Sequence, residues 1–262
     1  MKANTNKKFE ITTMKEIKRP SLFLFFTEIF RALLEYRKVI PFIKNYTVEK
    51  KRPPQQVLVI PGFMASDVST QPLRQFLQKF GYETHGWKLG TNFADLTQLP
   101  LISQQIDDLY AKNKEPINLI GWSLGGVYAR EMAKEQPEKI RQVITLGSPF
   151  SGILEPNNAN ITFRFISWLR GYPELDPDFI NGLPAPAEVP TTALYSKKDG
   201  IVPWQVCREQ VEDEIHENVE VTCSHLGMGV ECNVLEIIAD RLQYDATNWK
   251  KYDEATEPTT AA

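Results

Sequence analysis

Three residues that together can perform nucleophilic catalysis lie far apart in this sequence. Ser123 stands at the centre of the pentapeptide G-W-S-L-G, residues 121–125, which is a G-x-S-x-G motif. A serine hydroxyl is a poor nucleophile at neutral pH, so it needs an adjacent base and a third group that fixes the tautomer of that base. The motif therefore predicts Ser123 as the nucleophile of an acyl-transfer reaction.

The base must come from one of three histidines. His85 precedes the serine, and His216 lies in a charged run that we interpret as a solvated helix end. His225 directly follows the last predicted strand, residues 219–222, so its loop leaves the sheet at the same edge as Ser123. We predict His225 as the base.

The third group should be a carboxylate after the strand that precedes His225. Asp199 lies just past the predicted strand 191–196, and we expect it to orient the imidazole. Asp176 and Asp178 stay open as alternatives, although they lie in an irregular segment and not at a strand end.

Attack on an ester carbonyl creates an oxyanion, which needs two preorganised hydrogen-bond donors. The backbone N–H of Leu124, directly after the serine, is predicted to be one donor. The N–H of Phe63 is predicted to be the other, because Gly62 lets the loop after the strand 57–60 approach closely. This chemistry requires no metal and no nucleotide, so we expect no cofactor.

The motif lies between a short apolar strand, residues 117–120, and a helix that runs to Gln136. A chain that reverses within so few residues holds its apex, Ser123, in a strained backbone conformation. Side chains at Gly121 and Gly125 would collide with the neighbouring strand or helix, so both positions need glycine. The helix N-terminus then favours negative charge beside the hydroxyl.

Strands and helices alternate along the chain. The predicted strands span residues 57–60, 82–87, 117–120, 141–146, 191–196 and 219–222. The predicted helices span residues 69–80, 99–112, 127–136, 163–169 and 232–244. This order predicts an α/β fold, a mostly parallel central sheet with helices on both faces, whose site lies at the carboxyl ends of the strands.

Composition and charge restrict the class of protein. A hydrophobic content of 42% suits a globular domain with a sizeable core, and a net charge of −3 gives no sign of nucleic-acid binding. Three cysteines without a C-x-x-C motif indicate a reducing, cytoplasmic compartment. We expect residues 53–244 to form the catalytic domain, with 150–189 as a short lid-like segment and 245–262 as a polar tail.

Residues 1–52 are expected to hold a basic segment and an amphipathic helix. Between residues 21 and 36, apolar side chains recur at helical spacing: Leu22, Phe25, Phe26, Ile29, Phe30 and Leu33. One interpretation is peripheral membrane contact through residues 21–36, helped by the preceding lysines. The other, which we favour because apolar stripes mostly face a core, is a helix packed on the flank of the domain.

Together these residues resemble the α/β-hydrolase superfamily on its lipase and esterase side. The segments that carry the resemblance are residues 61–63, 121–126, 147–149, 196–204 and 224–227, and it extends over residues 57–242. The chain order serine, aspartate, histidine is that of the superfamily. The sequence is similar to small bacterial lipase-like hydrolases, distantly related to the deacylases of GPI anchors. The resemblance implies the α/β-hydrolase fold, a Ser-Asp-His triad and an acyl-enzyme intermediate.

The resemblance also implies a substrate, a carboxylic ester in lipid metabolism. The chain has Pro61 where many lipases have histidine, and a single glycine, Gly62, follows it. In the family, that single-glycine form accompanies medium and long acyl chains. We therefore expect the substrate to be a lipid-like or other small-molecule ester with such an acyl chain. Two alternatives stay open: transfer of the acyl group to an alcohol or thiol, and a non-catalytic scaffold of the same fold.

Overall fold

The computed structural model describes residues 17–48, 55–159, 170–172 and 176–253. The central sheet has the strand order β2-β1-β3-β4-β5-β6, and every neighbouring pair is parallel. Its strands are β1 (Gln56–Ile60), β2 (Glu83–Gly86), β3 (Ile117–Trp122), β4 (Ile140–Leu146), β5 (Thr191–Tyr195) and β6 (His216–Glu220). The predicted α/β fold is confirmed.

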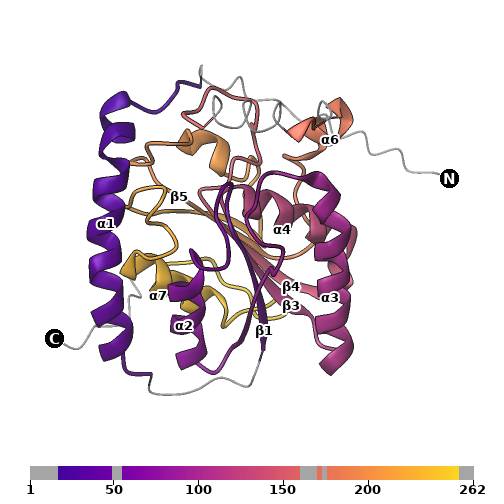
Figure 1. Ribbon diagram of the computed structural model, residues 1–262. Helices are drawn as coiled ribbons and strands as arrows, with labels where there is room; N and C mark the ends of the chain where they lie inside the picture. Colours follow the sequence, from indigo (N-terminus) through magenta and orange to yellow (C-terminus); the bar gives the residue numbers. More distant parts are fainter. Residues whose placement is uncertain (1–16, 49–54, 160–169, 173–175, 254–262) are drawn as a thin grey trace.

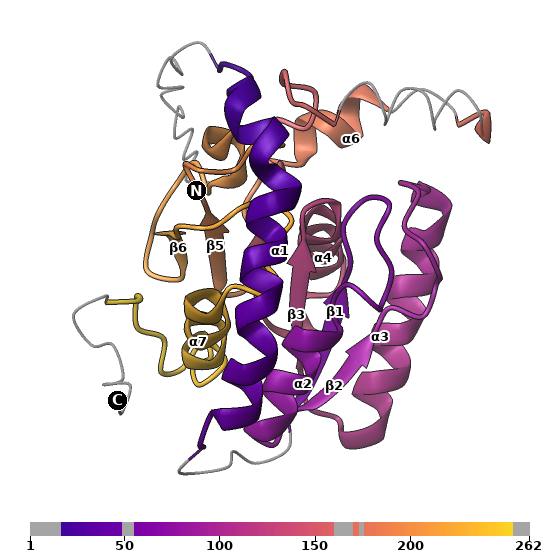
Figure 2. The same ribbon diagram turned by 60° about the vertical axis from the view of Figure 1, so that its left-hand side comes forward.

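Helices cover both faces of this sheet (Figures 1 and 2). The described helices are α1 (Leu22–Asn45), α2 (Gln71–Lys79), α3 (Leu99–Asn113), α4 (Leu124–Glu135), α6 (Pro177–Gly182) and α7 (Cys232–Arg241). Short 3-10 turns are η1 (Leu96–Gln98), η2 (Pro137–Lys139) and η3 (Trp204–Cys207). One layer consists of α1, α2 and α7, and the other of α3 and α4. The predicted helix 163–169 lies outside the described residues.

The apolar run of β1 shows how both layers are anchored. Val57 and Val59 pack in the core that includes α2 and α7, whereas Leu58 and Ile60 pack in the core that includes α3 and α4. Successive side chains of a strand point to opposite faces, so a strand buried on both faces must be apolar throughout.

The last strand begins earlier than predicted, and the prediction for His216 is wrong. His216 opens β6 and is buried, with Nε2 2.8 Å from the carbonyl oxygen of Ala187 and Nδ1 2.8 Å from Oδ1 of Asp213. Carboxylates of the surrounding run have partners inside the protein, including Glu217, which accepts a hydrogen bond from Thr192. The charged run is therefore only partly a solvated surface.

Helix α1 is longer than predicted. Its aromatic stripe faces outward, whereas we expected it to face the core of the domain. Leu22, Phe23, Phe26, Ile29, Phe30 and Leu33 are between 61% and 77% exposed. The buried residues of the helix are Glu28, Ala32 and Val39. The helix does lie on the flank of the domain, against α2 and α7 (Figure 2). It docks through the face that carries its two carboxylates.

Candidate active site

The turn from β3 into α4 places Ser123 at a strained apex. The backbone of Ser123 has φ 53° and ψ −121°, as predicted for this position. A Cβ atom on Gly121 would lie 2.3 Å from the carbonyl oxygen of Gly125, and one on Gly125 would lie 2.2 Å from that of Ile60. Only glycine fits at both places, so the two glycines permit the turn that lifts the hydroxyl out of the sheet edge.

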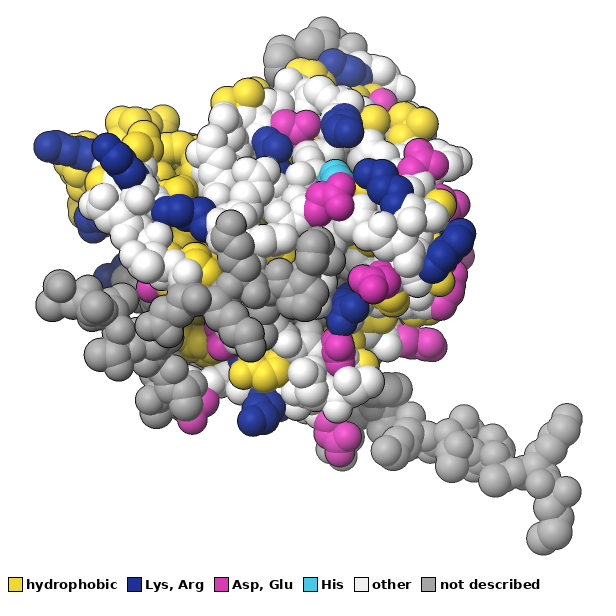
Figure 3. All heavy atoms as spheres, turned by 90° about the horizontal axis from the view of Figure 1, so that it is seen from below, with side chains coloured by type: hydrophobic (Ala, Val, Ile, Leu, Met, Phe, Trp, Pro, Cys, Tyr) yellow, Lys and Arg dark blue, Asp and Glu magenta, His cyan; other side chains and the backbone are white. Residues whose placement is uncertain are grey.

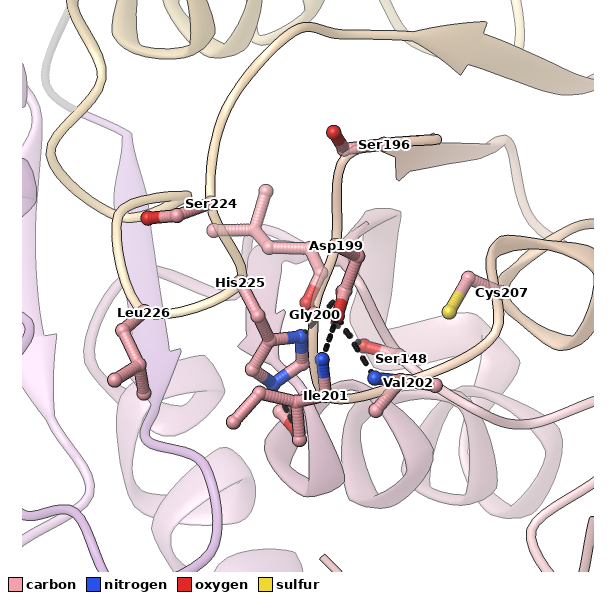
Figure 4. A network of polar contacts seen from close by, with 12 residues as sticks. Ser148, Ser196, Asp199, Gly200, Ile201, Val202, Cys207, Ser224, His225 and Leu226 are labelled. Carbon is pink, nitrogen blue, oxygen red and sulfur yellow. Dashed lines mark hydrogen bonds and ion pairs between the residues drawn. The ribbon is translucent and has the colours of Figure 1, made fainter. Parts of the chain in front are cut away.

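The structure brings His225 and Asp199 to this hydroxyl. Nε2 of His225 lies 3.0 Å from Oγ of Ser123, and Nδ1 lies 2.5 Å from Oδ2 of Asp199. Asp199 and His225 point toward each other in Figure 4, each from a loop that follows a strand at the carboxyl edge of the sheet. The three side chains thus form one continuous hydrogen-bonded chain.

Asp199 is held on its other side by the backbone. Its Oδ1 accepts hydrogen bonds from the N–H groups of Ile201 and Val202, each over 2.7 Å (Figure 4). The alternative carboxylates are placed differently: Asp176 and Asp178 are exposed, and Asp176 caps α6. Asp199 is therefore the carboxylate that the fold aligns with the imidazole.

The electrostatics of His225 suit a base. Burial lowers the pKa of the imidazole, but the carboxylates of Asp199 and, more weakly, Glu28 raise it, and the net pKa lies above the usual value of 6.5. A raised pKa strengthens the pull of the neutral imidazole on the proton of Ser123.

The residues predicted to supply the oxyanion donors lie next to Ser123 along the chain or in the adjacent loop. Leu124 is the first residue of α4, so no preceding helical turn offers an acceptor to its N–H. A Cβ atom on Gly62 would lie 3.0 Å from Cβ and 3.8 Å from Oγ of Ser123, which shows how closely the loop carrying Phe63 approaches.

Sequence reasoning missed Asn92, which holds this loop. Its Nδ2 donates to the carbonyl oxygen of Pro61 over 2.9 Å, its carbonyl accepts from the N–H of Met64, and its N–H donates to the carbonyl of Ala65. Asn92 is fully buried, and no local motif distinguished it from other asparagines in loops. It fixes the backbone on which the predicted donor of Phe63 depends.

Sequence reasoning also missed two carboxylates of α1, Glu28 and Glu35. Glu28 interrupts the apolar run of residues 22–33. That interruption was the available signal, since a carboxylate within an apolar segment needs a specific partner when it is buried.

Within the described residues, no cluster of three or more His, Cys, Asp or Glu side chains could hold a metal ion. His85 lies on β2 beside Glu83, and burial lowers its pKa.

Comparisons with known proteins agree with the fold. A model of the alpha/beta hydrolase fold matches residues 61–198, just over half of the chain. A curated relative, the biotin biosynthesis bifunctional protein BioHC of Teredinibacter turnerae, is 38% identical over 65 residues. That match covers 24% of this chain and 11% of the relative's length, so the chain corresponds to a small part of it.

Solved structures share the fold at low sequence identity. Lipase B of Aspergillus fumigatus superposes with a TM-score of 0.55 at 17% identity, covering 77% of this chain and 55% of its own. A pyrethroid hydrolase of Sphingobium faniae JZ-2 gives 0.53 at 17% identity, covering 74% of this chain and 100% of its own. The thioesterase domain of the curacin biosynthetic pathway superposes with a TM-score of 0.50 at 16% identity. The superposition covers 72% of this chain and 91% of the thioesterase domain.

Proposed function

Because this chain belongs to the alpha/beta hydrolase fold family, we propose that it is a serine hydrolase that cleaves carboxylic esters through an acyl-enzyme intermediate. The observation that carries the proposal is the chain of contacts from Asp199 through His225 to Ser123, at 2.5 Å and 3.0 Å. Each of the three groups has the partner that its role requires.

In the proposed reaction, Oγ of Ser123 attacks the ester carbonyl while Nε2 of His225 takes the hydroxyl proton. Asp199 stabilises the imidazolium, and the N–H groups of Phe63 and Leu124 stabilise the oxyanion. The tetrahedral intermediate collapses as the imidazolium gives its proton to the leaving alcohol. Water, activated by His225, then hydrolyses the acyl-enzyme and releases the acid.

The substrate that we propose is a lipid-like ester with a medium or long acyl chain. The support is the single Gly62 after Pro61, the form that accompanies such acyl chains in this family. We propose that the protein acts in the cytoplasm, because its three cysteines are free thiols.

A fluorophosphonate probe tests the proposal directly, because it reacts only with an activated serine. We expect stoichiometric labelling at Ser123 in the native protein, and none after Ser123→Ala or heat denaturation. A series of nitrophenyl esters of increasing chain length would then define acyl preference, and an added alcohol would separate hydrolysis from acyl transfer. Native protein that takes up no label at Ser123 would refute the enzyme assignment and favour a binding scaffold.

A further inference from the structure

The outward side of α1 is largely apolar. It is formed by residues that share one helical face, which we call the outer face: Leu22, Phe23, Phe26, Ile29, Phe30, Leu33, Leu34 and Ile40. These side chains are between 44% and 77% exposed. Single exposed apolar residues are normal, but a contiguous patch of this kind marks an interaction site.

The charges around the outer face have one sign. Both acidic residues of α1, Glu28 and Glu35, point inward, where they accept hydrogen bonds from the domain. From residue 17 to the end of the helix, the exposed charges are all basic: Lys18, Arg19, Arg37, Lys38 and Lys44. Seen from below in Figure 3, hydrophobic and basic side chains gather at the left-hand edge, where Figure 1 places α1.

We propose that the outer face of α1 docks on a lipid surface that carries anionic headgroups. A helix with an apolar face bordered by Lys and Arg and without exposed acid is suited to lie in the plane of a lipid interface. No helix among the described residues is long and apolar enough to cross a membrane, so the contact is peripheral. The net charge of −3 means that attraction to anionic lipid must come from this local surface and not from the whole protein.

The position of the patch also favours lipid over another protein. Leu24 and Glu28, on the reverse side of the same turns, contact Gly200, next to Asp199. The first turns of the outer face therefore lie beside the loops of the candidate active site. A docked lipid layer would lie next to the site at which an ester substrate reacts.

Vesicle co-sedimentation of the full chain tests this inference. We expect the wild type to pellet with vesicles of phosphatidylcholine and phosphatidylglycerol, and less with phosphatidylcholine alone. Phe26→Ser combined with Phe30→Ser should lower the partition coefficient roughly tenfold or more, because two aromatic side chains leave the interface. The double substitution Leu101→Ser and Val211→Ser, at exposed apolar residues elsewhere, should leave the partitioning unchanged.

Two results would overturn the inference. One is equal pelleting of the wild type and the Phe26→Ser, Phe30→Ser variant. The other is a wild type that sediments as a dimer in the ultracentrifuge while the variant sediments as a monomer, which would show that a second copy covers the outer face. Retained fluorophosphonate labelling of the variant would show that its site is intact.

A second, independent observation concerns the inward side of α1. Glu28 accepts hydrogen bonds from the N–H of Leu226 over 2.9 Å and from the N–H of Gly200 over 3.1 Å. These two residues directly follow His225 and Asp199 in the chain. A single buried carboxylate thus joins the loops that carry the base and its partner.

Glu35, about two helical turns after Glu28 on α1, contacts the His225 loop in a similar way. It accepts hydrogen bonds from the N–H of Ser224, over 2.9 Å, and from the hydroxyl of the same residue. A Cβ atom on Gly227 would lie 1.5 Å from Oε2 of Glu35, and one on Gly200 would lie 2.6 Å from Oε2 of Glu28. The carboxylates of Glu35 and Glu28 therefore lie directly against the backbone of Gly227 and Gly200.

We infer that Glu28 is a positioning residue, which holds the loops of Asp199 and His225 in register and supports the protonated imidazole. This inference rests on the proposed function. The charged groups that face His225 are Asp199, from the loop after β5, and Glu28, from α1, with Arg31 paired to Glu28 over 2.5 Å. Glu28 lies in the N-terminal helix, outside the residues that the family model matches.

The rate of fluorophosphonate labelling as a function of pH tests the role of Glu28. Glu28→Gln keeps the shape of the side chain but removes its charge and one acceptor. We expect the labelling rate to fall roughly tenfold to a hundredfold, as expected for a small misplacement of catalytic groups. The acid limb of the pH profile should also move to lower pH, because a carboxylate that raises the pKa of His225 is lost.

Glu209→Gln is the matched control, because Glu209 is another buried carboxylate and its arginine partner is Arg130 of α4. Unlike Glu28, it is not among the groups that raise the pKa of His225. We expect this control to lower stability in the same way without moving the pH profile. If the wild type is labelled and Glu28→Gln shows the same labelling rate and the same pH profile, the positioning role of Glu28 is refuted but the proposed function is not. No labelling of the wild type would instead refute the proposed function.

Discussion

Nε1 of Trp122 donates a hydrogen bond to the carbonyl oxygen of His225 over 3.1 Å. Trp122 ends β3 and directly precedes Ser123, so this bond joins the strand of the nucleophile to the loop of the base. The indole is 6% exposed, and Gly229 lies against its ring. This bond between the Trp122 side chain and the His225 backbone therefore helps to fix the distance from Ser123 to His225.

Trp122→Phe should weaken this connection. The carbonyl of His225 then keeps only the longer hydrogen bond from the N–H of Met228, over 3.4 Å. The free energy of unfolding in urea should fall by about 0.5–1.5 kcal/mol, as expected for the loss of one hydrogen bond. The esterase rate should fall several-fold as well, because the His225 loop loses a support. Trp87→Phe, which removes a bond from a buried indole to Gly90, should lower stability without lowering the rate. Equal rate losses in both variants would contradict this explanation.

Gly121→Ala should abolish activity. The added Cβ atom would lie 2.3 Å from backbone atoms of Gly125 and Gly126, neither of which can turn aside. We expect a variant whose nucleophile is displaced, with labelling at Ser123 reduced at least a hundredfold and a lower melting temperature. Gly182→Ala, on α6 with nothing within 4 Å, should keep both labelling and stability.

The candidate site could be predicted from sequence because each of its members has a local signal. Ser123 lies in a motif between a strand and a helix, and Asp199 and His225 each follow a strand. Parallel strands bring their carboxyl ends to one edge, so order along the chain was enough to place the three together.

The orientation of α1 could not be predicted in this way. Helical periodicity shows that a helix has two faces but does not show which face meets the domain. The choice is decided by Glu28, whose partners, the N–H groups of Gly200 and Leu226, lie 172 and 198 residues away in sequence. His216 was misjudged for the same reason, because its partner, the carbonyl of Ala187, is supplied by a distant loop.

The pH dependence of the proposed esterase reaction should follow His225. Its imidazole must be neutral to accept the serine proton, and its pKa is raised above 6.5 because Asp199 outweighs the opposing effect of burial. The value of kcat/KM should therefore rise with pH through a midpoint above 6.5. Asp199→Asn should lower kcat by about 10³–10⁴-fold and move this midpoint downward. A midpoint below 6.5 in the wild type would contradict the assignment.

A buried ion pair between Arg130 and Glu209 links α4 to the loop before β6, with side chains that are 0% and 1% exposed. Arg130 also donates to the carbonyl of Ala185 over 2.9 Å and lies 3.8 Å from the centroid of the Phe150 ring. Burial lowers the pKa of Arg130 and raises that of Glu209, so desolvation opposes the charged forms of both. The pair is therefore costly to break but gives the fold little net stability.

Arg130→Met should lower the free energy of unfolding by about 3–5 kcal/mol, because it leaves the carboxylate of Glu209 buried without its partner. Combining it with Glu209→Leu removes that uncompensated charge, so the double variant should recover most of the loss. Urea unfolding of both single variants and the double variant gives the coupling energy of the pair. A double variant that is less stable than either single variant would show that the ion pair itself, and not the avoidance of an unpaired charge, stabilises this contact.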